Sequence, residues 1–221
     1  MKQLPLVIAS GPSPSFDNFL PGRNAQAWAH LQTRPLPGTP VCLWGPAGSG
    51  KTHLLGALAA SLRAQGRSCG VFSASSPLPW VYDEAWSAVL LDDCEALDEA
   101  RQQAAFALFV HATASGIPVV AAAALPPVDL PLRDDLRSRL GWGLVFQLAS
   151  LSEAEARVVL QQHAELRGVA LPRETLDYLL TRFSRDLACL STLIERLDDY
   201  AIAQHRRALT VPLIKQMLAE D

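Results

Sequence analysis

The segment Gly45-Pro-Ala-Gly-Ser-Gly-Lys-Thr52 constrains the fold of this chain more than any other part of its sequence. It matches the phosphate-binding pattern G-x-x-x-x-G-K-[ST], with an apolar run before it at 41–44 and a helical pattern after it at 51–63. Glycine lets backbone N–H groups turn toward a phosphate, and the helix start adds free N–H groups and the positive end of its dipole. We therefore expect a strand, a loop and a helix that together bind nucleotide phosphates.

The motif also assigns tasks to individual residues. We expect Lys51 to contact the β- and γ-phosphates and the hydroxyl of Thr52 to ligate Mg²⁺. The alternative is a glycine-rich turn that binds nothing, which the complete pattern in its complete context disfavours. The nucleotide-binding candidates in this segment are Gly45, Pro46, Ala47, Gly48, Ser49, Gly50, Lys51, Thr52 and His53.

Composition narrows the class of protein. With 49% hydrophobic and 19% charged residues among 221, the chain is predicted to be globular, and its net charge of −3 disfavours a protein that mainly coats nucleic acid. Its four cysteines form no C-x-x-C pair, which is typical of free thiols in a reducing compartment. No signal sequence is recognised, and no apolar run approaches the ~18 residues of a membrane span. We expect a cytoplasmic protein.

Strand-like and helical patterns alternate as far as Ser150. Apolar runs lie at 41–44, 69–73, 88–92, 118–122 and 144–148, with helical patterns at 51–63, 98–115 and 132–140. This alternation predicts an α/β domain with a parallel five-stranded sheet between layers of helices. After Ser150 the patterns are only helical, at about 152–167, 172–183, 185–205 and 210–220. We therefore predict an extended segment at 1–14, an α/β domain at 15–150 and a small all-helical domain at 151–221.

The third predicted strand ends in two carboxylates, Asp92 and Asp93. Ligands of parallel sheets bind at the carboxyl ends of the strands, which is also where the phosphate-binding loop is expected. We predict that Asp92 reaches Mg²⁺ through water and that Asp93 lies near the attacking water. The alternative is a solvated acidic strand end without a ligand.

Four motifs occur in a fixed order: Ser15-Phe-Asp-Asn-Phe19 with Gly22 and Asn24, Gly50-Lys-Thr-His-Leu-Leu55, Leu91-Asp-Asp93, and Ser138-Arg-Leu-Gly-Trp-Gly143. Together they resemble the AAA+ core of the DnaA family of bacterial replication initiators, over about 15–219. The resemblance implies an AAA+ P-loop NTPase core with a helical lid, and ADP or ATP with Mg²⁺ as ligands. In that family the first motif lies near the adenine, which makes Phe16, Phe19 and Asn24 candidate contacts, with plain packing as the alternative.

Two differences from the initiators point to a regulator. We see no helix-turn-helix domain before Asp221, and only a short proline-containing stretch, 77–80, where initiators carry helices that engage single strands. The chain therefore resembles the Hda family of stand-alone regulatory inactivators of DnaA. This resemblance implies DnaA as a partner, with neither a membrane partner nor sequence-specific DNA binding. A homodimer is compatible with it.

The N-terminal segment Gln3-Leu-Pro-Leu-Val-Ile8 is similar to the peptide by which proteins dock on the replicative sliding clamp. In such a peptide the glutamine forms hydrogen bonds while alternate apolar side chains fill a pocket. We therefore predict clamp contacts for Gln3, Leu4, Leu6 and Ile8. An edge strand or a frayed terminus is the alternative.

Two positions where the DnaA family carries sensors of the nucleotide are alanines here. Ala124 follows the fourth predicted strand, where a polar residue would sense the γ-phosphate, and alanine offers no side-chain donor. The second sensor, an arginine in the family, aligns with Ala188. Arg185 lies on the same predicted helical face and is a candidate replacement. We expect that the chain itself hydrolyses ATP weakly.

Arg139 matches the family's arginine that acts in trans on the nucleotide of a neighbouring subunit. Arg133 and Arg137 are nearby alternatives, and a surface arginine paired with Asp134 or Asp135 is the non-functional interpretation. The resemblance implies a negative regulator that binds the DNA-loaded clamp and stimulates ATP hydrolysis by DnaA. A helicase-loader-like factor, a free-standing ATPase and an ATP-filament target selector are the competing interpretations.

Overall fold

The computed structural model describes residues 14–220 except 34–35, 183–186, 205 and 207. The described residues form two units, Pro14–Ser150 and the part that begins at Leu151. Each unit has its own hydrophobic core, so the two are described separately.

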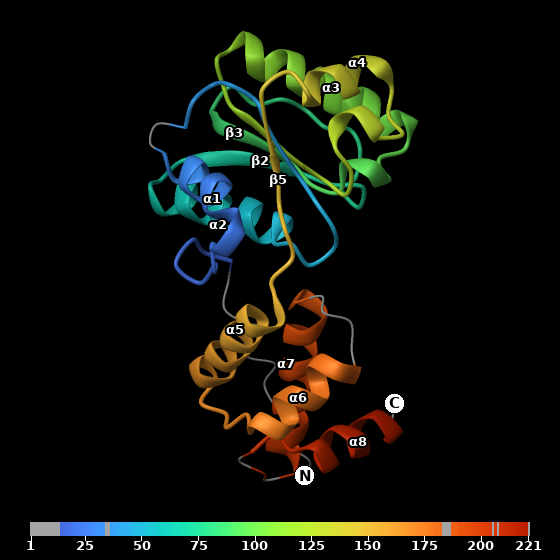
Figure 1. Ribbon diagram of the computed structural model, residues 1–221. Helices are drawn as coiled ribbons and strands as arrows, with labels where there is room; N and C mark the ends of the chain where they lie inside the picture. The colour runs from blue at the N-terminus through green and yellow to red at the C-terminus, as the bar shows by residue number, and fades with distance from the viewer. Residues whose placement is uncertain (1–13, 34–35, 183–186, 205, 207, 221) are drawn as a thin grey trace, which may run out of the picture. The chain divides into compact units, whose positions relative to one another are not determined.

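The first unit is built on a five-stranded parallel sheet with the strand order β2-β3-β4-β1-β5 (Figure 1). Its strands are β1 (Val41–Trp44), β2 (Ser68–Phe72), β3 (Trp86–Leu91), β4 (Val119–Ala123) and β5 (Leu144–Gln147). Because all five run in the same direction, their carboxyl ends lie along one edge of the sheet, where ligands of such sheets bind. The predicted parallel sheet is confirmed, with strand bounds close to those expected.

Helices cover both faces of this sheet. On one face lie α1 (Ala25–Gln32) and α2 (Lys51–Ala64), and on the other lie α3 (Glu99–Ala114) and α4 (Asp134–Leu140) (Figure 1). Successive residues of a strand pack into the hydrophobic cores on opposite faces of the sheet. In β3, Leu90 packs in the core that contains α2, and Leu91 packs in the core that contains α3. This burial on both faces explains why the three inner strands, β1, β3 and β4, read as continuous apolar runs. Helix α1 was not predicted, because it is short and buries only Ala27 and Leu31.

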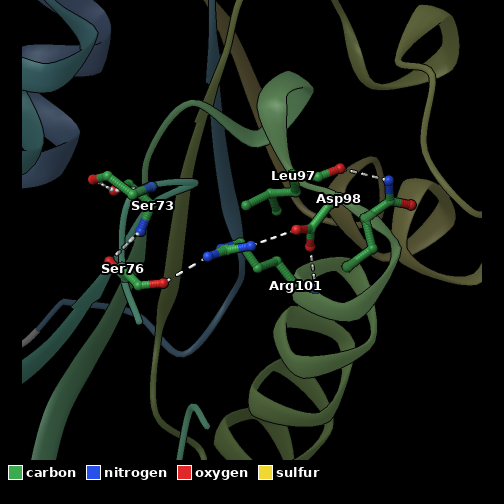
Figure 2. A network of polar contacts seen from close by, with 7 residues as sticks. Ser73, Ser76, Leu97, Asp98 and Arg101 are labelled. Atoms are coloured by element: carbon green, nitrogen blue, oxygen red, sulfur yellow. Dashed lines mark hydrogen bonds and ion pairs between the residues drawn. The ribbon is translucent and has the colours of Figure 1, made fainter. Parts of the chain in front are cut away.

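The connection between β2 and β3 is fastened to the start of α3. Asp98 caps this helix by accepting a hydrogen bond of 2.9 Å from the backbone N–H of Arg101, and its carboxylate also pairs with the Arg101 guanidinium. The same guanidinium donates from Nε to the carbonyl oxygen of Ser76 at 3.3 Å. Figure 2 shows Arg101 between Asp98 and Ser76, with Ser73 bonded to Ser76 in turn. The short proline-containing stretch is therefore part of the folded unit.

The second unit consists of α5 (Glu153–Leu166), α6 (Arg173–Arg182), α7 (Leu187–Ala203) and α8 (Val211–Glu220). A capping box starts α5, because Glu155 accepts from the backbone N–H of Ser152 while the Ser152 hydroxyl accepts from that of Glu155. The predicted all-helical character is confirmed. In the part of the chain that the structure describes, no helix has the length and apolar character needed to cross a membrane.

Candidate functional site

The phosphate-binding loop connects the end of β1 to the start of α2. Lys51 is the first residue of the helix, and its ammonium group donates to the carbonyl oxygens of Gly45 at 2.7 Å and Pro46 at 2.9 Å. Only 8% of Lys51 is exposed, so its charge is held inside the curve of the loop. The predicted strand, loop and helix are therefore present, and the ammonium group of Lys51 lies against the backbone of the loop.

Two glycines of this loop have no room for a side chain. A Cβ on Gly45 would lie 2.3 Å from the carbonyl oxygen of Leu148, and one on Gly50 would lie 2.6 Å from Cε2 of Phe19. Gly50 also has a φ of +94°, in the region that disfavours residues with a Cβ. The loop is thus shaped by its glycines and closely covered by Phe19.

The loop also contains a polar atom that lacks a partner. The hydroxyl of Ser49 is buried and makes no hydrogen bond among the described residues. Buried polar groups are normally paired, and a phosphate oxygen is a partner that this hydroxyl can take. Together with the glycines, Lys51 and the N-terminus of the 14-residue helix α2, this orphaned hydroxyl fits a bound nucleotide.

The three adenine-side candidates occupy different surroundings. Phe16 is a buried member of the core under α1 and α2. Phe19 lies against Gly50, and its ring centroid is 5.5 Å from that of His53. His53 in turn forms a hydrogen bond of 2.9 Å with the carbonyl oxygen of Ser15, which ties the N-terminal motif to α2. Of the two phenylalanines, Phe19 is the one that contacts the phosphate-binding loop.

Asn24 links the end of β5 to the first unit's N-terminal motif. Its buried amide accepts from the backbone N–H of Ala149 at 2.8 Å and donates to the carbonyl oxygen of Ala149 at 2.9 Å. A longer contact of 3.5 Å reaches the carbonyl oxygen of Ser49 in the phosphate-binding loop. Asn24 thus holds the backbone that follows β5 beside this loop, a task that sequence reasoning did not assign to it.

The predicted acidic residues lie at the end of β3, in the same row of strand ends. Asp92 is half-buried, and its carboxylate accepts from the backbone N–H of Asp93 at 3.0 Å. Asp93 has a left-handed backbone, with a φ of +48°. Partial desolvation, followed by the charges of Asp92 and Glu95, raises the pKa of the Asp93 carboxyl, and the charge of Lys51 opposes this shift.

Glu95 is a site residue that the sequence analysis missed. It lies in a short 3₁₀ helix, Cys94–Ala96, and its carboxylate accepts from the backbone N–H of Ala124 at 3.0 Å. Ala124 is the predicted sensor position after β4, so a carboxylate from the neighbouring strand end occupies its backbone donor. The only signal in the sequence was one more acidic residue two positions beyond Asp93.

A magnesium site would need help from the nucleotide. Thr52 is exposed and Asp92 half-buried, and in the described part of the chain no group of three or more His, Cys, Asp or Glu side chains could hold a metal ion. Mg²⁺ is commonly bound by one or two protein oxygens together with substrate phosphates and waters. The residues present fit that mode of binding.

Arg139 differs from the other two arginines of its segment. Arg133 pairs with Asp135 at 2.8 Å and Arg137 with Asp134 at 2.5 Å. Arg139 forms no ion pair with any described residue, and its guanidinium carbon lies 5.0 Å from the centroid of the Trp142 ring. The two nearby carboxylates are therefore taken by the two arginines that were the alternatives.

Five of the predicted site residues cannot be placed. Gln3, Leu4, Leu6 and Ile8 of the clamp-docking segment lie outside the described residues, as does Arg185.

Part of this chain matches a protein family, and its fold matches those of several solved structures. Residues 153–218 match the family model described as Hda, lid domain. Domain III of the Thermotoga maritima replication initiation protein DnaA superposes with a TM-score of 0.77 and 22% identity, over 95% of this chain and 98% of that one. AMPPCP-bound DnaA from Aquifex aeolicus gives a TM-score of 0.68 and 21% identity, over 84% and 65% of the two chains. Thermotoga maritima RuvB, a Holliday junction branch migration motor, gives 0.66 and 17%, over 94% and 72%.

These likenesses show an AAA+ fold, with a P-loop α/β domain and a helical lid. More closely, residues 153–218 are similar to the lid domain of the Hda family, and the fold as a whole is similar to that of DnaA domain III.

Proposed function

We propose that this protein is a negative regulator of replication initiation that stimulates ATP hydrolysis by a DnaA-type initiator. The observation that carries the mechanism is the state of Arg139, whose charge no carboxylate of the described residues neutralises. An arginine supplied to a neighbour's nucleotide stabilises the charge of the transition state, an effect of about 10³–10⁵ in rate in comparable NTPases. The match to the Hda lid family supports the choice of DnaA as the neighbour.

The nucleotide of the regulator itself is proposed to be a structural ligand, ADP or ATP with Mg²⁺. The glycine-rich loop, Lys51 and the orphaned Ser49 hydroxyl support binding. Ala124 has no polar side chain, and its backbone N–H already donates to Glu95. With no side-chain donor there for a γ-phosphate, we infer that the protein's own turnover is slow, whereas the turnover of its partner is stimulated.

The sliding clamp is proposed to bring the regulator to newly replicated DNA. Its docking segment would be Gln3, Leu4, Leu6 and Ile8, supported by sequence similarity alone. A clamp-bound regulator would present Arg139 to ATP-bound DnaA only where a clamp is loaded. Replication restarts would thereby be suppressed after initiation.

The central test is ATP hydrolysis by DnaA in the presence of DNA-loaded clamp and this protein. We expect Arg139→Ala to abolish stimulation while clamp binding, measured by pull-down, is unchanged. Arg137→Ala is the matched control, since it removes a neighbouring arginine that is paired with Asp134. Undiminished stimulation by the Arg139→Ala protein would remove the arginine-finger assignment.

A second experiment separates the proposal from its competitors. We expect the full chain to capture both clamp and DnaA, and a chain without residues 1–8 to lose only the clamp. Capture of the replicative helicase instead would favour a helicase-loader-like factor. Steady ATP turnover without DnaA would favour a free-standing ATPase.

A further inference from the structure

An exposed cleft surrounds Arg139 on the outer side of α3 and α4. It has a volume of about 370 Å³ and is lined by Phe106, Asp135, Ser138, Arg139 and Trp142. Within it, Asp135 is already paired with Arg133 and also accepts from the backbone N–H of Leu136 at 2.8 Å. The cleft therefore combines one unneutralised cation with two aromatic rings.

Packing in a hydrophobic core does not account for the position of Trp142 in this cleft. Its side chain is 66% exposed, and it belongs to neither hydrophobic core of the first unit. Aromatic rings bury a large apolar area when they pack, and the Trp142 ring leaves most of that area in solvent. The position of this ring therefore needs an explanation other than core packing.

The backbone on both sides of Trp142 is held in place. Its own N–H donates to the carbonyl oxygen of Arg139 at 3.2 Å, in the turn that ends α4. The next residue, Gly143, has no room for a side chain, since a Cβ there would lie 1.9 Å from the carbonyl oxygen of Pro40. Leu144 then donates to the same carbonyl at 2.9 Å and begins β5. The chain thus presents the Trp142 ring beside the Arg139 side chain by means of its backbone.

We propose that Trp142 is a positioning residue for Arg139, whose guanidinium it holds by a cation–π contact until the arginine meets a phosphate of a neighbouring AAA+ module. The proposal rests on the proposed function of Arg139. A carboxylate partner would compete with the incoming phosphate for the same cation, whereas an aromatic face attracts the cation without adding a negative charge. Holding a long side chain in the right orientation also reduces the ordering that remains when the arginine meets the transition state of the docked neighbour, an effect on rate.

The test compares two apolar replacements of Trp142 in the stimulated hydrolysis assay. Trp142→Phe keeps an aromatic face, and Trp142→Leu keeps apolar bulk without one. We expect Trp142→Phe to remain near the unaltered protein and Trp142→Leu to lower the stimulated kcat by about three- to tenfold, the range of a cation–π contact. The concentration of regulator needed for half-maximal stimulation should not change. In the Arg139→Ala background, Trp142→Leu should have no further effect.

Val128→Ala is the matched control for docking area. Val128 is 77% exposed in the short 3₁₀ helix Pro127–Asp129, which packs on α4 in the same unit. We expect this variant to leave kcat unchanged. If Trp142→Leu instead raises the half-maximal concentration with kcat intact, the ring is a docking contact and the positioning role is overturned. An unchanged kcat and half-maximal concentration overturn it as well.

A spectroscopic readout tests the contact in the regulator alone. The ring current of Trp142 should displace the NMR signal of the Arg139 Nε–H, and Trp142→Leu should abolish this displacement while Trp142→Phe retains part of it. No change on Trp142→Leu overturns the contact itself. Absence of stimulation by the unaltered protein overturns both proposals, whereas normal stimulation with an unaffected Trp142→Leu variant overturns only the one made here.

Discussion

The carboxylate of Glu95 accepts a hydrogen bond from the backbone N–H of Ala124, with 3.0 Å between oxygen and nitrogen. The bond joins the residues that follow two neighbouring strands, β3 and β4, at the edge of the sheet where a nucleotide is expected. It gives the backbone donor at the alanine sensor position a partner within the protein.

Removal of the Glu95 carboxylate should destabilise the first unit. In Glu95→Ala the N–H of Ala124 loses its partner, which costs about 1–2 kcal/mol in the free energy of unfolding for a partly buried group. Glu95→Gln keeps an acceptor oxygen and should lose much less. Urea unfolding measures both, with the exposed Glu84→Ala as control. Equal stability of Glu95→Ala and Glu84→Ala would contradict the assigned bond.

A side chain at Gly50 should strain the fold through both the backbone and Phe19. The positive φ costs about 1–3 kcal/mol for a residue with a Cβ, and the contact of 2.6 Å with Phe19 adds overpacking. Gly66 has a φ of +70° with nothing within 4 Å, so Gly66→Ala reports the backbone cost alone. Thermal unfolding should rank Gly50→Ala as the less stable variant. In a Phe19→Ala background, Gly50→Ala should lower the thermal stability by less than it does in the unaltered protein. An equal loss of stability in both backgrounds would rule out the clash.

Lys51 should be essential for nucleotide binding. Its ammonium group lies among the carbonyls of the phosphate-binding loop, and losing a charged hydrogen bond to phosphate should weaken binding by about tenfold or more. Titration calorimetry of Lys51→Ala with Mg·ADP and Mg·ATP measures this loss. Lys215→Ala is the control, because that lysine lies over the Tyr178 ring in the lid. Equal affinities of the two variants would argue against nucleotide binding at the loop.

The stability of the fold should depend on the protonation of His53. Burial lowers the pKa of His53 below 6.5, outweighing the hydrogen bond to Ser15, so the unfolded chain binds a proton more readily than the folded one. The contribution of His53 is therefore complete above pH 6.5 and is lost as the pH falls below that value.

The matching measurement is urea unfolding between pH 5 and pH 8, with His53→Gln for comparison. Glutamine can still donate to the Ser15 carbonyl but does not titrate. His30, whose pKa burial also lowers, stays in both proteins, so the difference between the two curves reports on His53. Parallel curves would contradict the assigned role.

Much of the fold could be predicted because its signals are local. The strands of the sheet are continuous apolar runs, and the lid helices start at recognisable caps such as the one at Ser152. Helix α1 escaped prediction because only Ala27 and Leu31 of its eight residues are buried. Such a short helix is stabilised by tertiary packing rather than by its own periodicity.

The candidate site also combines features that local sequence predicts with contacts between residues far apart in the chain. The phosphate-binding loop and the strand-end carboxylates could be predicted, because each depends on neighbours in sequence. The bond from Glu95 to Ala124 spans 29 positions and that from Asn24 to Ala149 spans 125. No periodic pattern reports such pairings, since they exist only once parallel strands bring their ends together.

The sequence by itself determined that a strand, a glycine-rich loop and a helix follow one another in this order, because the pattern lies in eight consecutive residues and their immediate neighbours. It also singled out Arg139 as the candidate trans-acting residue, with Arg133 and Arg137 as alternatives in the same segment. Only the tertiary structure shows which of the three forms an ion pair, since ion pairing depends on where side chains meet in space. Arg133 and Arg137 have carboxylates, and Arg139 has the face of Trp142.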